Sequence, residues 1–380
     1  MSGAWPTPEQ EQMLLACLAA EPEATRALDR IVSRNGEQVG EGCAQFLPLL
    51  YRRWPSRQDA ILITGKKAYL TVWRQNQDRM LHLMSLLEGF QEQGIACLVL
   101  KGAALILAYY QDPGLRSMRD IDLLVHERDL DAAIAYLIRA GYVAEQGFEN
   151  SAILKQVRVG HAWQFSLGTE QSCDLHWRPV VRCYSPEVAK LFWEGARAVN
   201  PGNVTALVLS PTDQLFHVCA HGLQWDWVPQ IRWIADAVTV LREPIDWDRI
   251  TRLATVSCMR VRLAHALSYL ARSFGAPIPA SLPGRLERSA PGWERREYRL
   301  LLKPCPLGVF DSVAWHAYHF RRIRPFDAGW SRVPVWVGFP QYLQTFLGAE
   351  SLPELFRKLW PELRMRGKLP FKPRATRSSP

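Results

Sequence analysis

The hydrophobic pattern changes from helical to strand-like in the middle of this chain, and that change limits its possible folds most. Residues 95–100 form a continuous apolar run, which is typical of a buried strand, and residues 120–125 predict a second strand. Residues 160–167 and 172–177 flank a turn-forming segment and predict a hairpin. Residues 91–182 are therefore expected to form a small unit of strands and helices.

The segments around this unit have helical patterns. Met80, Leu83, Met84 and Leu87 recur at the spacing of one helical face, and Gly94 follows as a stop signal. A length of 380 residues suggests several domains. We expect an N-terminal helical region (1–90), the central unit of strands and helices (91–182), a helical domain (183–275), a Trp- and Arg-rich helical extension (285–362) and a basic flexible tail (363–380).

The cysteines and the N-terminus bear on the compartment. The eight cysteines are scattered without a C-x-x-C pair, which favours a reducing, cytoplasmic environment over a disulfide scaffold or zinc knuckle. Residues 1–12 lack the apolar core of a signal peptide. The apolar runs are shorter than the ~20 residues of a membrane span, so no membrane partner is expected.

The net charge of +9 raises the question of an anionic partner. Most of this excess lies in the tail, whose cations after Glu362 are Arg364, Arg366, Lys368, Lys372, Arg374 and Arg377. The rest of the chain is only mildly basic, so we expect no specific nucleic-acid partner.

Paired acids carry the strongest chemical signal. Asp120 and Asp122 alternate on a predicted strand, so both carboxylates should share one face. Such a pair suits Mg²⁺ together with substrate phosphates; taken alone, it also fits two exposed acids on an edge strand. Asp174 and His176 share one face of the later hairpin strand. A third carboxylate there would hold a second metal or act as a base, while His176 is either catalytic or a polar residue beside a packed Trp177.

Basic and glycine residues precede the acid pair. Lys101-Gly102 follows the first strand and opens a helix predicted over residues 103–110, where backbone N–H groups favour phosphate. Arg116 and Arg119 could neutralise phosphate oxygens. A plain strand-to-helix turn and ordinary surface arginines would explain the same residues.

In combination these motifs resemble the nucleotidyltransferase superfamily with the DNA polymerase β-like catalytic fold. More narrowly, residues 80–270 resemble the bacterial family described simply as uncharacterised nucleotidyltransferases. The matching residues are Lys101-Gly102, Arg116, Met118, Asp120, Asp122, Gly141-Tyr142, Asp174, His176, Trp177, His221, Trp233 and Asp236.

The resemblance implies an α+β fold in which a mixed-sheet nucleotidyltransferase core is flanked by helical regions. It implies Asp120, Asp122 and Asp174 as catalytic metal ligands for Mg²⁺ or Mn²⁺, and Gly102 as a phosphate contact, with Lys101 and Arg116 also in the nucleotide-binding motif. The implied reaction transfers a nucleoside monophosphate from a nucleoside triphosphate such as ATP to a peptide or protein, a sugar or a small molecule.

Two other functions stay open. An Asp-x-Asp pair also occurs in metal-dependent glycosyltransferases, although Lys101-Gly102 and Asp174 argue against that class. Ala103 stands where the wider superfamily has Ser or Gly, which motivates an inactive nucleotide-binding or scaffold protein. His217 and His221 have a zinc-compatible helical spacing, but the interpretation we favour places them at the interface with the catalytic unit.

Overall fold

A seven-stranded mixed sheet lies at the centre of the computed structural model, which describes residues 5–34, 39–40, 42–144, 157–169, 171–223, 231–303 and 309–364. The strand order is β3-β4-β5-β2-β1-β7-β6. The strands are β1 (Cys97–Leu100), β2 (Ile121–Val125), β3 (Val143–Ala144), β4 (Ala162–Leu167), β5 (Gln171–His176), β6 (Arg197–Val199) and β7 (Ala206–Val208).

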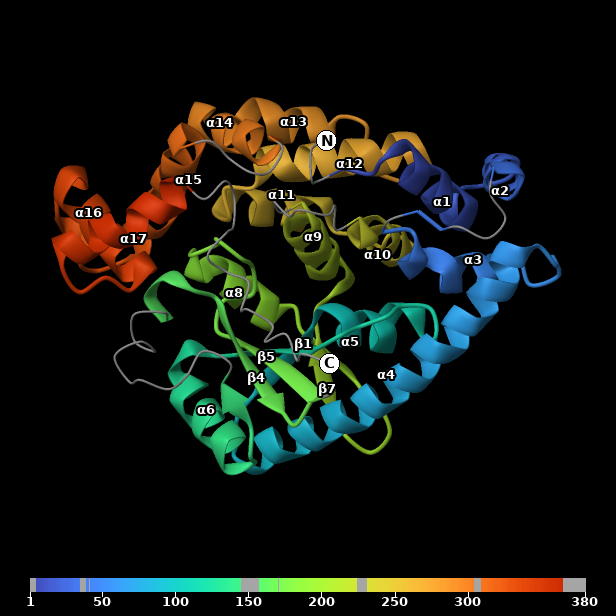
Figure 1. Cartoon of the computed structure of the whole chain (residues 1–380), viewed down its shortest axis with the longest axis horizontal. Helices are drawn as coiled ribbons and strands as arrows, with labels where there is room; N and C mark the ends of the chain where they lie inside the picture. Colours follow the sequence, from blue (N-terminus) through green and yellow to red (C-terminus); the bar gives the residue numbers. More distant parts are fainter. Residues whose placement is uncertain are drawn as a thin grey trace.

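Helices make up most of the remaining described chain (Figure 1). They are α1 (Pro8–Leu18), α2 (Glu23–Arg34), α3 (Leu47–Arg53), α4 (Ala60–Glu92), α5 (Lys101–Leu105), α6 (Leu130–Arg139), α8 (Pro186–Glu194), α9 (Pro211–Gly222), α10 (Arg232–Val240), α11 (Trp247–Val256), α12 (Arg260–Phe274), α13 (Leu282–Ser289), α14 (Gly292–Leu301), α15 (Val309–Ile323), α16 (Val335–Leu347) and α17 (Leu352–Arg364). The expected α+β class, a mixed sheet with flanking helical regions, is confirmed.

The strands that carry the acids form where the apolar runs predicted them, with small shifts at their ends. β2 begins at Ile121, so Asp120 lies just before the strand rather than on it. The helix expected over residues 103–110 begins two residues earlier, at Lys101, and continues as a π-helical turn over Ile106–Tyr110. The hairpin is present as β4 and β5, which pair antiparallel.

The two faces of the sheet enter different hydrophobic cores because side chains alternate along each strand. Val99 and Leu123 belong to a core shared with α4 and α6. Leu98 and Leu124 belong to the other core, which α9 to α12 share with the N-terminal helices α1 to α3. Figure 1 shows α4 and α6 on one side of the sheet and α9 to α12 on the other. Asp122 has the same parity as Leu124 and so faces the helical side.

Other expectations about the chain stay predictions. The division into five regions is one of them, and nearly all of its basic tail, residues 363–380, lies outside the described residues. The seven described cysteines form no disulfide with one another, while cytoplasmic location itself stays a prediction. None of the helices in the described ranges combines the length and apolar character needed to cross a membrane.

A buried ion pair joins the loop before β2 to the helical side of the sheet. Arg116, in the loop before β2, donates from Nε and Nη2 to the two carboxylate oxygens of Asp236 on α10, at 2.9 and 3.0 Å. The Tyr110 hydroxyl donates to the same carboxylate at 2.9 Å. The Arg116 and Asp236 side chains are 11% and 5% exposed, so each charge depends on the other for compensation.

We expect Asp236→Ala to lower the free energy of unfolding by about 3–5 kcal/mol, because it leaves Arg116 buried without its counter-charge. Urea denaturation followed by circular dichroism measures this loss. The control Glu243→Ala removes an exposed acid just beyond α10 and should change stability by less than ~0.5 kcal/mol. The double variant Arg116→Met/Asp236→Leu should recover part of the loss, and equal losses in Asp236→Ala and the control would contradict the role of the pair.

Candidate active site

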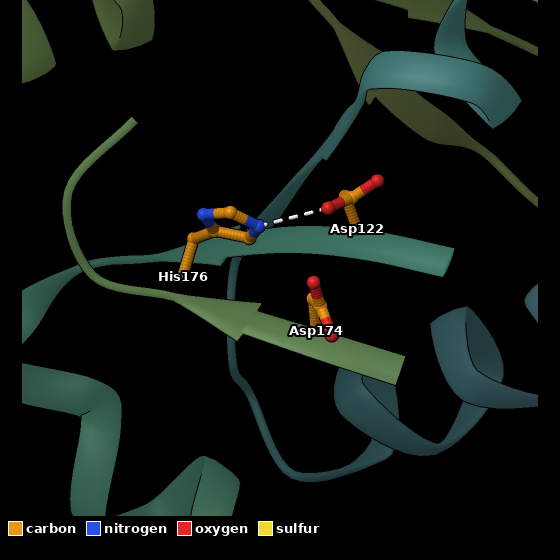
Figure 2. A group of neighbouring side chains, drawn as sticks. All are labelled: Asp122, Asp174 and His176. Atoms are coloured by element: carbon orange, nitrogen blue, oxygen red, sulfur yellow. Dashed lines mark hydrogen bonds and ion pairs between the residues drawn. The ribbon is translucent and has the colours of Figure 1, made fainter. Parts of the chain in front are cut away.

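Asp122 and Asp174 lie side by side on the two parallel strands at the middle of the sheet. The register of β2 and β5 pairs Asp122 with Asp174 and Leu124 with His176. Since residues in register on neighbouring strands have side chains on the same face, both carboxylates and the His176 ring project to one side (Figure 2). The sheet itself therefore positions these three groups.

His176 is bound to Asp122 rather than being an isolated polar residue. Its Nε2 lies 2.9 Å from Asp122 Oδ1, and both side chains are only 1% exposed. Its Nδ1 is buried and has no hydrogen-bond partner among the described residues. Burial, followed by the positive charge of Lys101, lowers the pKa of His176, which is therefore neutral at pH 7.

Lys101 supplies the second partner of Asp122. Its Nζ lies 2.5 Å from Asp122 Oδ1. Lys101 directly follows β1, whose last residue Leu100 pairs with Asp122, and its φ of 47° lies in the left-handed region. A non-glycine residue rarely adopts this conformation, and such backbone strain concentrates at functional sites. The turn from β1 to α5 thus places an ammonium group over the buried acid.

The electrostatics of the site centre on Asp122. Burial alone would raise its pKa, but the charge of Lys101 and the hydrogen bond with His176 lower it well below the usual value. Asp120 differs, because burial and the charge of Asp122 raise its pKa. Burial would lower the pKa of Lys101, but Asp122, Asp174 and Asp120 together raise it. At neutral pH the site is therefore a cation within a cluster of carboxylates.

Three side chains could hold a metal ion. Asp122, Asp174 and His176 each offer an atom within 4.8 Å of the others, and they are the one such group of at least three in the part of the chain that the structure describes. The carboxylate oxygens of Asp122 and Asp174 suit Mg²⁺ and Mn²⁺. Imidazole nitrogen suits ions such as Zn²⁺ better, so the two acids, rather than His176, are the donors that fit the expected metal. Asp120 is not among these three, but its charge helps to raise the pKa of Lys101, and the charge of Asp122 raises the pKa of Asp120.

The other residues expected at the site have structural partners. Gly102 is buried, and a Cβ there would lie 2.7 Å from both Arg116 Nη1 and Met118 Cβ, so this close approach requires glycine. The Arg116 guanidinium is directed at Asp236. A phosphate contact of Gly102 or Arg116 stays a prediction, whereas their packing roles are visible.

The two histidines of α9 face the catalytic unit. His217 and His221 line a cavity of about 120 Å³ together with Lys101 and Arg116. His217 Nε2 lies 3.0 Å from the carbonyl oxygen of Pro179 and therefore donates to it. The interface position favoured over a zinc site agrees with these contacts.

A family model for uncharacterised nucleotidyltransferases matches residues 45–275, more than half of the 380 residues. The chain belongs to this nucleotidyltransferase family. A search of curated proteins finds no match to it. The site described above lies wholly within the matched range, as do α4, the sheet and α9 to α12.

Two features of the site were missed or left open by the sequence motifs. The first is the contact between His176 and Asp122. Strand alternation predicts the face on which each side chain lies, but only the pairing of β5 with β2 brings the two residues together. Arg232 lines the cavity beside Lys101 and had no sequence signal, because it stands in an arginine-rich chain outside any motif.

Acid should destabilise the protein partly through His217. Burial and the charge of Lys101 lower its pKa to about 3. Between this value and the unfolded pKa near ~6.5 the unfolded chain binds the extra proton, so stability falls as the pH drops through that window. From pH 7 to pH 5 this contribution should be about 2 kcal/mol.

Urea denaturation at both pH values compares the wild type with His217→Gln, which keeps an N–H donor for Pro179. The variant should lose less stability than the wild type on acidification. An equal loss in the two proteins would show that His217 does not carry the effect.

Proposed function

We propose that this protein is a metal-dependent nucleotidyltransferase that moves a nucleoside monophosphate from a nucleoside triphosphate to an acceptor. The observation that carries the proposal is the group of Asp122, Asp174 and His176, in which Lys101 also contacts Asp122. All four residues lie within the range that the family model matches. A pair of acids without these neighbours would be much weaker support for the proposal, because paired acids are common on protein surfaces.

The reaction is a substitution at phosphorus. The nucleophilic atom of the acceptor forms a bond to the α-phosphorus, the bond from that phosphorus to the bridging oxygen breaks, and pyrophosphate leaves. Asp122 and Asp174, with Asp120 beside them, would hold Mg²⁺ or Mn²⁺. When bound, such an ion would neutralise phosphate charge and orient the reacting groups.

The protein's own residues would prepare the site in three ways. Lys101 compensates Asp122 and offers a fixed positive charge for substrate phosphate. Asp174, half-buried on β5, is placed to accept the acceptor's proton or to bind a second ion. Gly102 and Arg116 complete the predicted nucleotide contact at the start of α5.

A second candidate is a nucleotide-binding protein without transfer activity. Ala103, in place of the superfamily Ser or Gly, is 1% exposed and packs in the core beneath the sheet. Its methyl group offers no hydroxyl for phosphate. Binding of Mg²⁺ and a nucleoside triphosphate without NMP transfer would favour this second function. A glycosyltransferase would instead consume a sugar nucleotide.

We expect Asp122→Asn and Asp174→Asn each to reduce NMP transfer by at least ~10²-fold, because each removes a carboxylate from the metal group. The assay incubates the protein with each nucleoside triphosphate, Mg²⁺ or Mn²⁺ and candidate peptides, proteins or sugars, and detects the added NMP by mass spectrometry. Asp131→Asn, an exposed acid on α6, is the control and should keep wild-type activity. Full activity in either site variant would reject its assignment as a metal ligand.

Metal binding can also be followed without turnover. Adding Mn²⁺ should raise the melting temperature of the wild type, because an ion that binds only the folded state stabilises it. The rise should vanish in Asp174→Asn and persist in Asp131→Asn. If Mn²⁺ leaves the melting temperature of the wild type unchanged, the proposed metal site is contradicted.

A further inference from the structure

We propose that the cavity between α5 and helices α9 and α10 binds a phosphate group of the nucleoside triphosphate, with Arg232 as its principal ligand. The inference rests on the proposed function and extends it, because it assigns a binding role to a residue outside the acid cluster and the family motif residues.

The cavity has the size and lining of an anion site. Its volume is about 120 Å³, below the ~300–1,000 Å³ typical of pockets that enclose whole small ligands, so it fits a phosphate group rather than a nucleoside. Three cations, Lys101, Arg116 and Arg232, line it together with one acid, Asp236. His217 and His221 line the same space.

The charges around the cavity leave one cation without an ion pair. Lys101 is bound to Asp122, and Arg116 is bound to Asp236 through both carboxylate oxygens. Arg232 instead donates to two neutral acceptors, from Nε to Gln45 Oε1 at 2.9 Å and from Nη1 to the Ser117 carbonyl at 2.7 Å. Among the described residues no ion pair involves Arg232, and it keeps a charge available for an anion.

Arg232 is also held in an unfavourable position for a cation. Burial, followed by repulsion from Arg116, lowers its pKa to about 10. It remains charged at pH 7, so placing it there costs free energy that a bound anion would return. Its two neutral hydrogen bonds fix the guanidinium plane, which favours phosphate recognition by a planar fork of donors.

Trp233 provides an independent observation. This residue lines the cavity and is only 3% exposed. Its indole Nε1 is buried and has no hydrogen-bond partner among the described residues. An indole N–H can only donate, so it needs an acceptor, and a phosphate oxygen in the cavity is one candidate. The ring also packs against Trp5 and Tyr269, which do not line the cavity, so Arg232 carries the assignment.

The cavity adjoins the acid cluster through one side chain. Lys101 lines the cavity and at the same time contacts Asp122. A phosphate group beside Arg232 and Trp233 would thus lie across Lys101 from the carboxylates that we assign to the metal. This arrangement suits a metal–triphosphate complex. Its metal ion would lie at the carboxylates, and its remaining negatively charged phosphate oxygens would lie at Arg232.

The test measures binding of inorganic tripolyphosphate by isothermal titration calorimetry, together with the KM for the nucleoside triphosphate. Arg232→Met should weaken tripolyphosphate binding by at least about tenfold, because it removes the unpaired charge and its fork of donors. Trp233→Phe keeps the ring and loses one N–H, so about three- to tenfold weaker binding is expected. Arg242→Met, an exposed arginine just after α10, is the matched control and should bind as the wild type does.

Circular dichroism verifies that each variant is folded. If Arg232→Met does not fold, Arg232→Lys, which keeps the charge and loses the fork, takes its place with an expected several-fold loss. Wild-type affinity in the folded Arg232 variant overturns the proposal. Tripolyphosphate binding that depends on Arg232 with an unchanged KM for the nucleotide also overturns it, because the cavity would then take free inorganic phosphates.

The two proposals fail in different ways. If Arg232→Met raises the dissociation constants for tripolyphosphate and nucleotide but the wild type transfers no NMP, the transfer function is rejected and the phosphate site stands. If NMP transfer occurs and its KM is the same in Arg232→Met and Arg242→Met, the phosphate site is rejected and the transfer function stands.

Discussion

The burial of one carboxylate explains much of the site's construction. Asp122 is 1% exposed, and an ionised acid in that position is unstable unless nearby groups compensate its charge. The protein supplies Lys101 from the end of β1 and His176 from β5, and both converge on the same oxygen, Oδ1. The left-handed backbone of Lys101 and the parallel pairing of β2 with β5 therefore have the same effect: each brings a partner to the buried carboxylate of Asp122.

The sequence predicted the parts of the site that depend on local patterns. Strand alternation placed Asp174 and His176 on one face, and the apolar runs located β1 and β2 to within two residues. The strand boundary differs at Asp120, which lies in a bend just before β2, where the alternation rule does not apply; its charge still helps to raise the pKa of Lys101. The partner of Arg116 was also out of reach, since Asp236 lies 120 residues away and only tertiary packing brings it near.

The two sides of Lys101 have opposite chemical character. On the sheet side are Asp122, Asp174 and His176, the group that could hold a metal ion. On the side of α9 and α10 is the cavity lined by Arg232 and Trp233, to which we assign a phosphate group. Because the acids on the sheet side and Arg232 are kept apart, they do not form ion pairs with one another. Arg116 and Asp236, by contrast, neutralise each other in a direct ion pair. A substrate that is itself part cation and part anion would satisfy both sides together, and this is the physical reason why a metal–nucleotide complex suits the site.

The long helix α4 has a mechanical consequence. Its first turn places Ile61 and Leu62 in the core of the N-terminal helices, and its last turns place Leu83 and Phe90 beneath the sheet. Its 33 residues extend about 50 Å as one continuous rod without an internal proline. A continuous helix that enters both cores sets the distance between them, which opposes a hinge motion of the sheet relative to the N-terminal helices. Any movement that opens the cavity to a substrate would then involve the shorter elements that line it, α5, α9 and α10, rather than a hinge between the two cores.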